Sequence, residues 1–193
     1  HDPKMQIRVS EDTPRAFLRL VLDMIRGGLS SFAFVGDGAV KKEIEEYCRE
    51  NGLANVVFIP YQDKDKLVYG LNAADVHIVN NAKGIKGVSV PSKIYGVLAA
   101  NVPILGILEP GSEAWSIIED SGCGILAEAG DYDAIRKALD RIVIEKEAFV
   151  KAHETGRTYL EARFMREKSI GAYGEAIAGL CAEPDATSRS VQA

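Results

Sequence analysis

The residues whose types and spacing most favour chemistry lie in one glycine-rich loop and at the start of the helix that follows it. The candidate binding residues there are Lys86, Gly87, Val88, Ser89, Ser92 and Lys93. Glycines let a backbone approach a ligand closely, N–H groups at a helix start attract anions, and lysines offset ligand charge. This combination predicts a diphosphate site. The alternative is that Ser89 or Ser92 only caps the helix and Lys93 is a solvated residue of its first turn.

Two shorter turns directly follow predicted strands and could approach a ligand at the same edge of a sheet. Gly36 and Gly38 permit a sharp turn, and Pro60 and Tyr61 could hold a base beside it. The third glycine of a dinucleotide-binding motif is missing, so these two glycines do not by themselves indicate a ligand. A tight turn that binds nothing would carry the same residues. Tyr61 could equally cover the core from a loop shaped by the proline.

The remaining polar residues carry weaker signals. Glu109, in a further loop at this edge, could accept hydrogen bonds from sugar or ribose hydroxyls, whereas Ser112 with Glu113 would cap the next helix. His77 lies in an apolar strand and is expected in the core, and His153 lies on a charged helix and is expected to be solvated. The sequence contains no Ser/His/Asp grouping, HExxH motif, P-loop or metal-spaced cluster. We therefore assign no catalytic residue and expect no metal or other cofactor.

The elements that must position these residues alternate along the chain. Apolar runs without polar alternation are typical of parallel strands covered on both faces, and they occur at 32–35, 56–59, 76–79, 104–107 and 124–126. Helical patterns follow at 41–50, 63–73, 92–100 and 131–144, with Asp63 and Asp131 as expected caps. Residues 5–9 and 13–26 fit an opening strand and helix, and 145–180 one or two long helices. The pattern predicts an α/β fold with a Rossmann-like, doubly wound parallel sheet and C-terminal helices.

Length and composition narrow the class of protein. The chain has 193 residues, of which 47% are hydrophobic, which suffices for one core. We expect one domain over 1–180 and a flexible tail over 181–193. A net charge of -5 argues against a nucleic-acid-binding protein. The three cysteines form no CxxC pair and indicate a reducing, cytoplasmic environment, and no apolar run is long enough to span a membrane.

From residue 31 to about 144 the chain resembles the C-terminal domain of retaining GT-B glycosyltransferases of family four. The resemblance is carried, in the order of that family, by 34–38, 55–61, 73–76, 89–104, 122–125 and 131–139. It implies half of a GT-B fold that binds a nucleoside-diphosphate-sugar donor in surface polysaccharide or glycoconjugate biosynthesis. It also implies that Gly36, Gly38, Pro60 and Tyr61 lie near the nucleoside, that residues 89–93 meet the diphosphate, and that residues 84–88 approach the donor sugar.

The sequence departs from the family pattern in two features. Most members carry two glutamates eight residues apart, where this chain has Val88 and Gly96. The family also carries basic residues, usually Arg and Lys, in the loop between its first strand and first helix. They have no secure counterpart in this chain, where Arg8 and Arg15 are candidates only. The Val-Pro-Ser-Lys form resembles a subgroup associated with amino- or deoxy-sugar transfer.

The resemblance also implies an N-terminal acceptor-binding domain that this chain lacks, so the chain alone is expected to bind donor without transferring sugar. It leaves open a peripheral association with a membrane acceptor at the inner face of the membrane. Two alternatives are a non-catalytic interaction domain that retains the half fold and a fragment of a nucleotide-sugar epimerase. The sequence does not specify the base, the sugar, the acceptor or the linkage.

Overall fold

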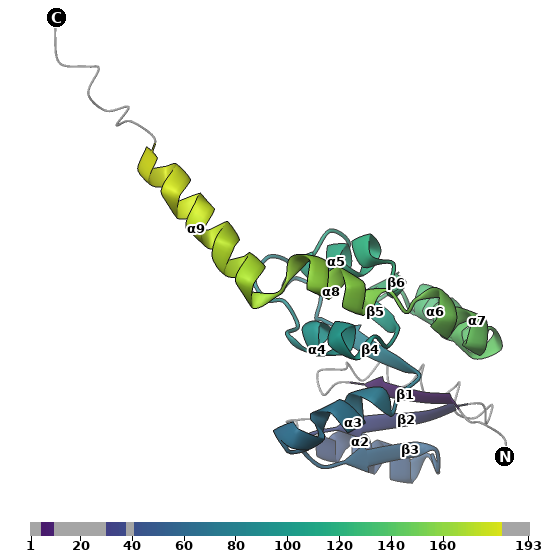
Figure 1. The fold of residues 1–193 in the computed structure, drawn as a ribbon. Helices are drawn as coiled ribbons and strands as arrows, with labels where there is room; N and C mark the ends of the chain where they lie inside the picture. The colour runs from purple at the N-terminus through teal and green to yellow at the C-terminus, as the bar shows by residue number, and fades with distance from the viewer. Residues whose placement is uncertain (1–4, 10–29, 38–40, 183–193) are drawn as a thin grey trace, which may run out of the picture. The chain divides into compact units, whose positions relative to one another are not determined.

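The computed structural model describes residues 5–9, 30–37 and 41–182, and its strands form one six-stranded sheet (Figure 1). The strands are β1 Met5–Val9, β2 Ser30–Val35, β3 Val56–Ile59, β4 Val76–Asn80, β5 Ile104–Leu108 and β6 Gly124–Glu128. Every pairing between them is parallel. All six predicted strands are confirmed, whereas the predicted helix at 13–26, Gly38 and most of the predicted tail lie outside the described residues.

From β2 to β6 the described helices lie between successive strands, and four more follow β6. They are α2 Lys41–Glu50, the 3-10 helix η1 Lys64–Lys66, α3 Leu67–Asn72, α4 Lys93–Ala100, α5 Glu113–Ser121, α6 Tyr132–Ile144, α7 Lys146–Ala152, α8 Gly156–Arg163 and α9 Arg166–Ala182. Asp131 caps α6 by accepting a hydrogen bond from the Ala134 N–H at 2.9 Å, as predicted. The prediction of an Asp63 cap was wrong, because its side chain makes no capping bond and the segment opens as a 3-10 turn.

Residues 145–180 were predicted as one or two long helices, and this was also wrong. Three helices, α7, α8 and α9, lie between residues 146 and 182. The first interruption of the helices lies at His153, whose backbone N–H donates to the Val150 carbonyl and closes α7. The second lies just before α9.

Helices cover both faces of the sheet, as a doubly wound arrangement requires. On one face α2, α6 and α7 bury the side chains of alternate strand residues such as Phe34, Ile78 and Ile107. On the other face α3, α4 and α5 cover the residues between them; the Ile118 side chain of α5, for example, lies over Gly106. All five residues of β4 and of β5 are buried; β5 is apolar throughout, and β4 is apolar except for the buried His77 and Asn80.

The strand order β3-β2-β1-β4-β5-β6 reverses direction once. The chain builds outward from β1 to β3, then returns to the other side of β1 and builds outward again to β6. The switch therefore lies between β1 and β4. In open parallel sheets this is the point where loops diverge and leave a crevice at the carboxyl edge.

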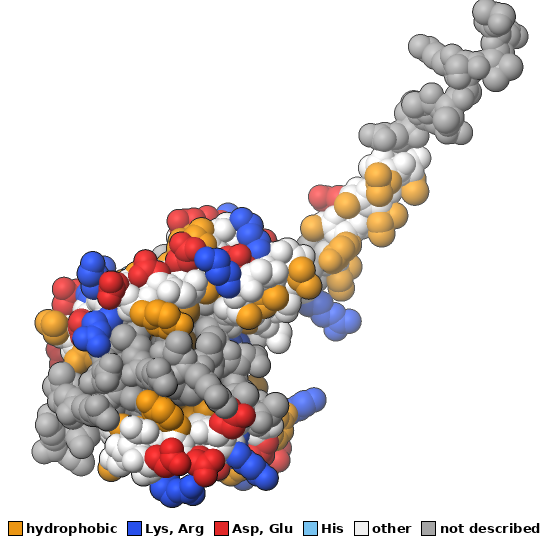
Figure 2. All heavy atoms as spheres, turned by 180° about the vertical axis from the view of Figure 1, so that it is seen from behind, with side chains coloured by type: hydrophobic (Ala, Val, Ile, Leu, Met, Phe, Trp, Pro, Cys, Tyr) orange, Lys and Arg blue, Asp and Glu red, His pale blue; other side chains and the backbone are white. Residues whose placement is uncertain are grey.

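The chain divides into two compact units, His1–Arg157 and Thr158–Ala193. The second unit contains most of α8 and all of α9. Along α9 the exposed apolar residues Ile170, Tyr173, Ile177 and Leu180 recur every three or four positions, a spacing that places them on one side of a helix. Figure 2 shows hydrophobic side chains along this helix. Within the described residues, no helix combines the length and apolar character needed to cross a membrane.

Candidate functional site at the carboxyl edge of the sheet

The loop from β4 to α4 leaves the sheet beside the topological switch point. It contains five of the ten predicted binding residues, between positions 86 and 92, and a sixth, Lys93, begins α4. Because all strands are parallel, the loops after β2, β3, β5 and β6 open at the same edge. The fold thus supplies the common edge that the sequence analysis required.

Two glycines shape this loop. Gly84 has a φ of 91° and Gly87 a φ of 77°, both in the left-handed region that residues with a Cβ rarely adopt. The backbone between them turns tightly, because the N–H groups of Val88 and Ser89 both donate to the Ile85 carbonyl, at 3.0 and 3.3 Å. The Val88 side chain is 81% exposed. The loop therefore presents its tip, with Val88 and Ser89, to solvent.

The start of α4 lies at the base of this loop. Ser92 occupies the N-cap position in a helical conformation, and its side chain makes no capping hydrogen bond. The alternative in which Ser92 serves only as a cap is therefore wrong. Lys93, the first residue of α4, extends its ammonium group to 3.5 Å from the Asn80 Oδ1, and Asn80 is only 3% exposed at the end of β4. A hydroxyl and an ammonium group thus stand at the amino end of a helix, which favours an anion.

Glu109, which follows β5, holds the same loop from the other side. Its Oε2 accepts hydrogen bonds from the backbone N–H groups of Gly84, at 2.8 Å, and Lys86, at 3.1 Å. The Lys86 ammonium in turn donates to the Pro110 carbonyl at 2.9 Å. Two N–H groups of the glycine loop are therefore already satisfied by protein. The expected Ser112 cap is confirmed, since its Oγ accepts from the Trp115 N–H at 3.3 Å.

A second group of predicted residues lies after β2 and β3. The Gly36 N–H donates to the Ile59 carbonyl at 2.9 Å, which draws the two turns together. Asp37 accepts a hydrogen bond from the Lys41 ammonium at 2.6 Å. That hydrogen bond, the charge of Lys41 and a weaker bond from the Tyr61 backbone lower the pKa of the Asp37 carboxyl. The Tyr61 side chain is 72% exposed, so it is not the cover over the core that one alternative required.

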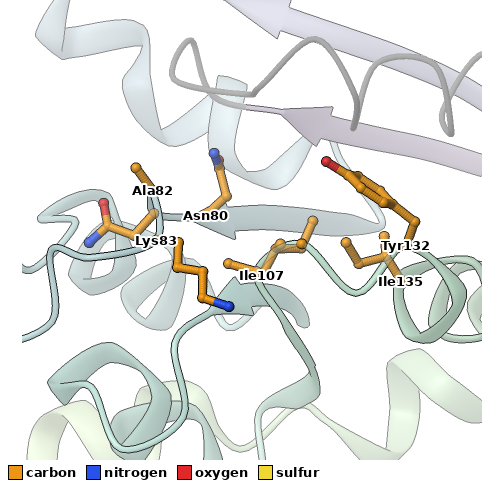
Figure 3. A pocket seen from close by; sticks show the side chains of 9 residues that line it. Asn80, Ala82, Lys83, Ile107, Tyr132 and Ile135 are labelled. Carbon is orange, nitrogen blue, oxygen red and sulfur yellow. The ribbon is translucent and has the colours of Figure 1, made fainter.

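A cavity of about 190 Å³ opens beside the glycine loop (Figure 3). The described residues that line it are Asn80, Asn81, Ala82, Lys83, Ile107, Ala129, Gly130, Tyr132 and Ile135. They come from the ends of β4 and β5, from the turn after β6 and from the start of α6. Two amides, an ammonium and a phenol belong to this lining, most of whose exposed surface is apolar.

The structure brings the predicted residues together in two groups. Residues 86–93 form one, and Gly36 with Pro60 and Tyr61 forms the other; β1 lies between them in the strand order. None of the nine predicted residues that the structure describes lines the cavity, which begins at the strand end just before residues 86–93. Their roles in binding stay a prediction.

Sequence reasoning missed several polar residues of this edge. Asn80 and Asn81 follow a buried strand directly, and that position is a signal that could have been used. The Asn81 Nδ2 donates to the Ser89 carbonyl at 3.1 Å and so supports the loop. Tyr132 stands at the start of α6, and nothing in its local sequence distinguishes it from a surface tyrosine.

The two histidines considered from sequence lie away from the loop tip. His77 is 4% exposed and its Nε2 lies 2.8 Å from the Leu71 carbonyl, which confirms a satisfied core residue. His153 was expected to be solvated, and this was wrong: it is partly buried, with its ring 4.2 Å from that of Phe149. Over the described ranges, His, Cys, Asp and Glu side chains form no group of three or more that could hold a metal ion.

Comparison with known proteins identifies the family to which this chain belongs. A curated relative, the probable glycosyltransferase WbjE of Pseudomonas aeruginosa, is 32% identical over 124 residues, covering 63% of this chain and 30% of its own. The putative colanic acid biosynthesis glycosyl transferase WcaI of Escherichia coli K12 is 26% identical over 149 residues, covering 77% and 36%. The chain therefore spans about a third of the length of these relatives.

A solved structure shows the same fold at low identity. It is a mutant of S. aureus TarM in complex with Fondaparinux, alpha-GlcNAc-glycerol and UDP; it superposes with a TM-score of 0.68 at 14% identity, covering 89% of this chain and 35% of its own.

The parallel sheet, its single switch point and the loops at its carboxyl edge define a Rossmann-like domain of the GT-B glycosyltransferase type. Residues 30–159 match the family described as glycosyl transferases group 1, and the chain belongs to this family. The resemblance stated from sequence, and the α/β half of a GT-B fold that it implied, are thereby confirmed.

Proposed function

We propose that this domain binds the nucleoside-diphosphate-sugar donor of a glycosyltransferase at the carboxyl edge of its sheet. The observation that carries the proposal is the loop from Lys86 to Lys93, which lies at the switch point and leads into α4. Ser92 stands at the N-cap position of this helix, and its side chain makes no capping hydrogen bond. The two lysines and the helix start offer positive charge within a chain of net charge -5. The TarM structure named above was solved with UDP, which supports a nucleotide of this kind.

In this proposal, the diphosphate lies near Ser92 and Lys93, and the sugar enters the adjacent cavity. Asn80, Lys83 and Tyr132 could exchange hydrogen bonds with sugar hydroxyls there. The nucleoside would extend toward Tyr61 across the end of β1. No metal ion is required, because the helix start and the lysines can stabilise the negative charge of the leaving diphosphate.

We propose further that the acceptor is bound by a part of the enzyme outside this chain. The chain matches only 30% and 36% of the two curated relatives, which leaves most of their length for other functions. The product would be a surface polysaccharide or glycoconjugate; the name of the colanic acid relative supports this substrate class.

Titration calorimetry with UDP, GDP, ADP and their sugars tests donor binding. We expect Lys93→Ala to weaken binding about 10- to 100-fold, because a hydrogen bond to a charged group contributes about 1.5–3 kcal/mol. Lys151→Ala is the matched control, since this exposed lysine in the last turn of α7 lies outside the loops at the carboxyl edge. Failure of every nucleotide to bind at about 1 mM, a contribution of only about 4 kcal/mol, would refute the proposal.

A second candidate function is a non-catalytic interaction domain. It is favoured by the absence of carboxylates at Val88 and Gly96, the positions where most members of the family carry glutamates. Val88 is exposed at the loop tip, and a Cβ at Gly96 would lie 3.6 Å from the Leu71 side chain, so both positions have room for a larger residue. The same calorimetry distinguishes the two functions, because an interaction domain would bind no nucleotide and would instead retain a partner chain in a pull-down.

A further inference from the structure

The glycine loop after β4 and the loop after β5 are joined by three hydrogen bonds. One oxygen of Glu109 accepts both the Gly84 and the Lys86 backbone N–H, and the Lys86 ammonium donates to the Pro110 carbonyl. The donors and acceptors lie 23 to 25 residues apart in sequence, but they follow adjacent strands. We call this set of three bonds the loop brace.

The brace acts on an exposed segment, which is also held by the bond from Asn81 to the Ser89 carbonyl and by the ion pair of Lys83 with Glu128. A Cβ added to Gly84 or Gly87 would meet no heavy atom within 4 Å, and residues 82–84 and 86–90 are exposed. An exposed loop with two left-handed glycines has many accessible conformations, and ordering it costs conformational entropy. A carboxylate that fixes two loop amides reduces that cost before any ligand arrives.

The geometry also constrains Lys86. A Cβ on Gly111, which has a φ of 71°, would lie only 2.8 Å from the Lys86 Nζ. The ammonium group therefore crosses directly over this glycine on its way to the Pro110 carbonyl. The loop after β5 thus sets both the backbone and the charged side chain of the loop after β4.

We propose that Glu109 is a positioning residue for donor binding: it holds residues 84–88 in the conformation that receives the donor, without contacting the ligand itself. The inference rests on the proposed function. A direct contact is disfavoured because Glu109 is half-buried, its Oε2 already accepts two hydrogen bonds, and its negative charge would repel a diphosphate.

Three variants of the 193-residue chain test the proposal. Glu109→Ala removes the brace. Glu109→Gln removes the charge but keeps an oxygen that can accept both N–H bonds. Glu113→Ala, at an exposed glutamate four residues later in the first turn of α5, is the control for loss of one negative charge from this region.

Two measurements are made on each variant: amide hydrogen exchange of Gly84 and Lys86 by NMR, and the Kd for UDP and for UDP-sugars by calorimetry. We expect Glu109→Ala to speed exchange at both amides and to raise the Kd, each about tenfold, which corresponds to about 1.4 kcal/mol. Glu109→Gln should recover most of both effects, to within about threefold of wild type. The control should match wild type in both.

Each other result overturns the inference at a defined step. Unchanged exchange in Glu109→Ala means that the brace is not formed. Faster exchange with unchanged affinity means that the brace does not serve binding, and a Glu109→Gln variant as weak as Glu109→Ala means that the charge acts directly. If wild type binds no nucleotide, the proposed function fails and the role of Glu109 with it, while the exchange data still establish whether the brace exists.

Discussion

Gly124 offers the sharpest test of the sheet that carries the proposed site. It begins β6 and lies opposite Ile104 of β5 in the parallel register. A Cβ at this position would lie 1.9 Å from the Ile104 carbonyl oxygen and 2.7 Å from its carbon, and real Cβ atoms essentially never come closer than 3.0 Å to another heavy atom. In Gly124→Ala the two backbones must therefore separate by about 1 Å, because a carbonyl oxygen, unlike a flexible side chain, cannot turn away.

The magnitude follows from the groups that this separation disturbs. Overpacking of a close contact costs about 1–3 kcal/mol. The adjacent hydrogen bond from the Ile104 N–H to the Cys123 carbonyl, at 3.0 Å, spans the same gap, and its loss would cost about 0.5–1.5 kcal/mol. We therefore expect Gly124→Ala to lower the free energy of unfolding by about 2–4 kcal/mol and, at about 2–4 °C per kcal/mol for a chain of this size, to lower Tm by about 5–15 °C.

Thermal and urea unfolding followed by circular dichroism measure the effect. Gly96→Ala is the matched control: this glycine lies inside α4, and its Cβ would make only an ordinary contact, 3.6 Å from the Leu71 Cδ1. We expect it to leave stability unchanged or to raise it by up to about 1 kcal/mol, because alanine is the better helix former. If the free energy of unfolding of Gly124→Ala lies within about 0.5 kcal/mol of the wild-type value, the reasoning is refuted, because the close approach of β5 and β6 at this residue would not exist.

Two further predictions follow from perturbed ionisation. Lys41 lowers the pKa of Asp37, so this carboxylate stabilises the fold at neutral pH and the stabilisation is lost as the pH falls through the depressed pKa. The urea midpoint of Asp37→Asn should therefore lie below that of wild type at neutral pH and converge with it in acid; a difference independent of pH would contradict this. Burial raises the pKa of the Cys48 and Cys123 thiols, and the charge of Glu45 adds to the effect at Cys48, whereas Cys181 is exposed. We expect only Cys181 to react rapidly with a disulfide reagent in the folded chain, which the absorbance of the released thiolate measures, and three equal rates would contradict the burial.

Most of the fold could be predicted because its signals are local. β5 is buried over its whole length and is apolar throughout, as a strand covered on both faces requires. β4 is buried likewise and departs from this pattern only at His77, whose ring bonds the Leu71 carbonyl, and at Asn80. Asp131 is the N-cap of α6 and accepts a hydrogen bond from a backbone N–H only three residues later, so its role is also set by the neighbouring sequence. The breaks in the C-terminal helices were missed because no glycine or proline marks the first of them, at His153, where ring contact with Phe149 and a bond to its carbonyl replace solvation.

The candidate site could be predicted only in part, for a reason that Glu109 makes clear. A parallel sheet brings every strand end to one edge, so sequence suffices to place Glu109 and the glycine loop there together. The groups that Glu109 bonds are backbone N–H donors, which every residue except proline possesses, so no residue type at positions 84 or 86 identifies them as partners. Contact of this carboxylate with sugar or ribose hydroxyls was one of two alternatives left open by the sequence, and in the structure its Oε2 bonds protein amides. A ligand-binding role inferred from an acidic residue at such an edge therefore requires that the neighbouring loop amides first be shown to have other acceptors.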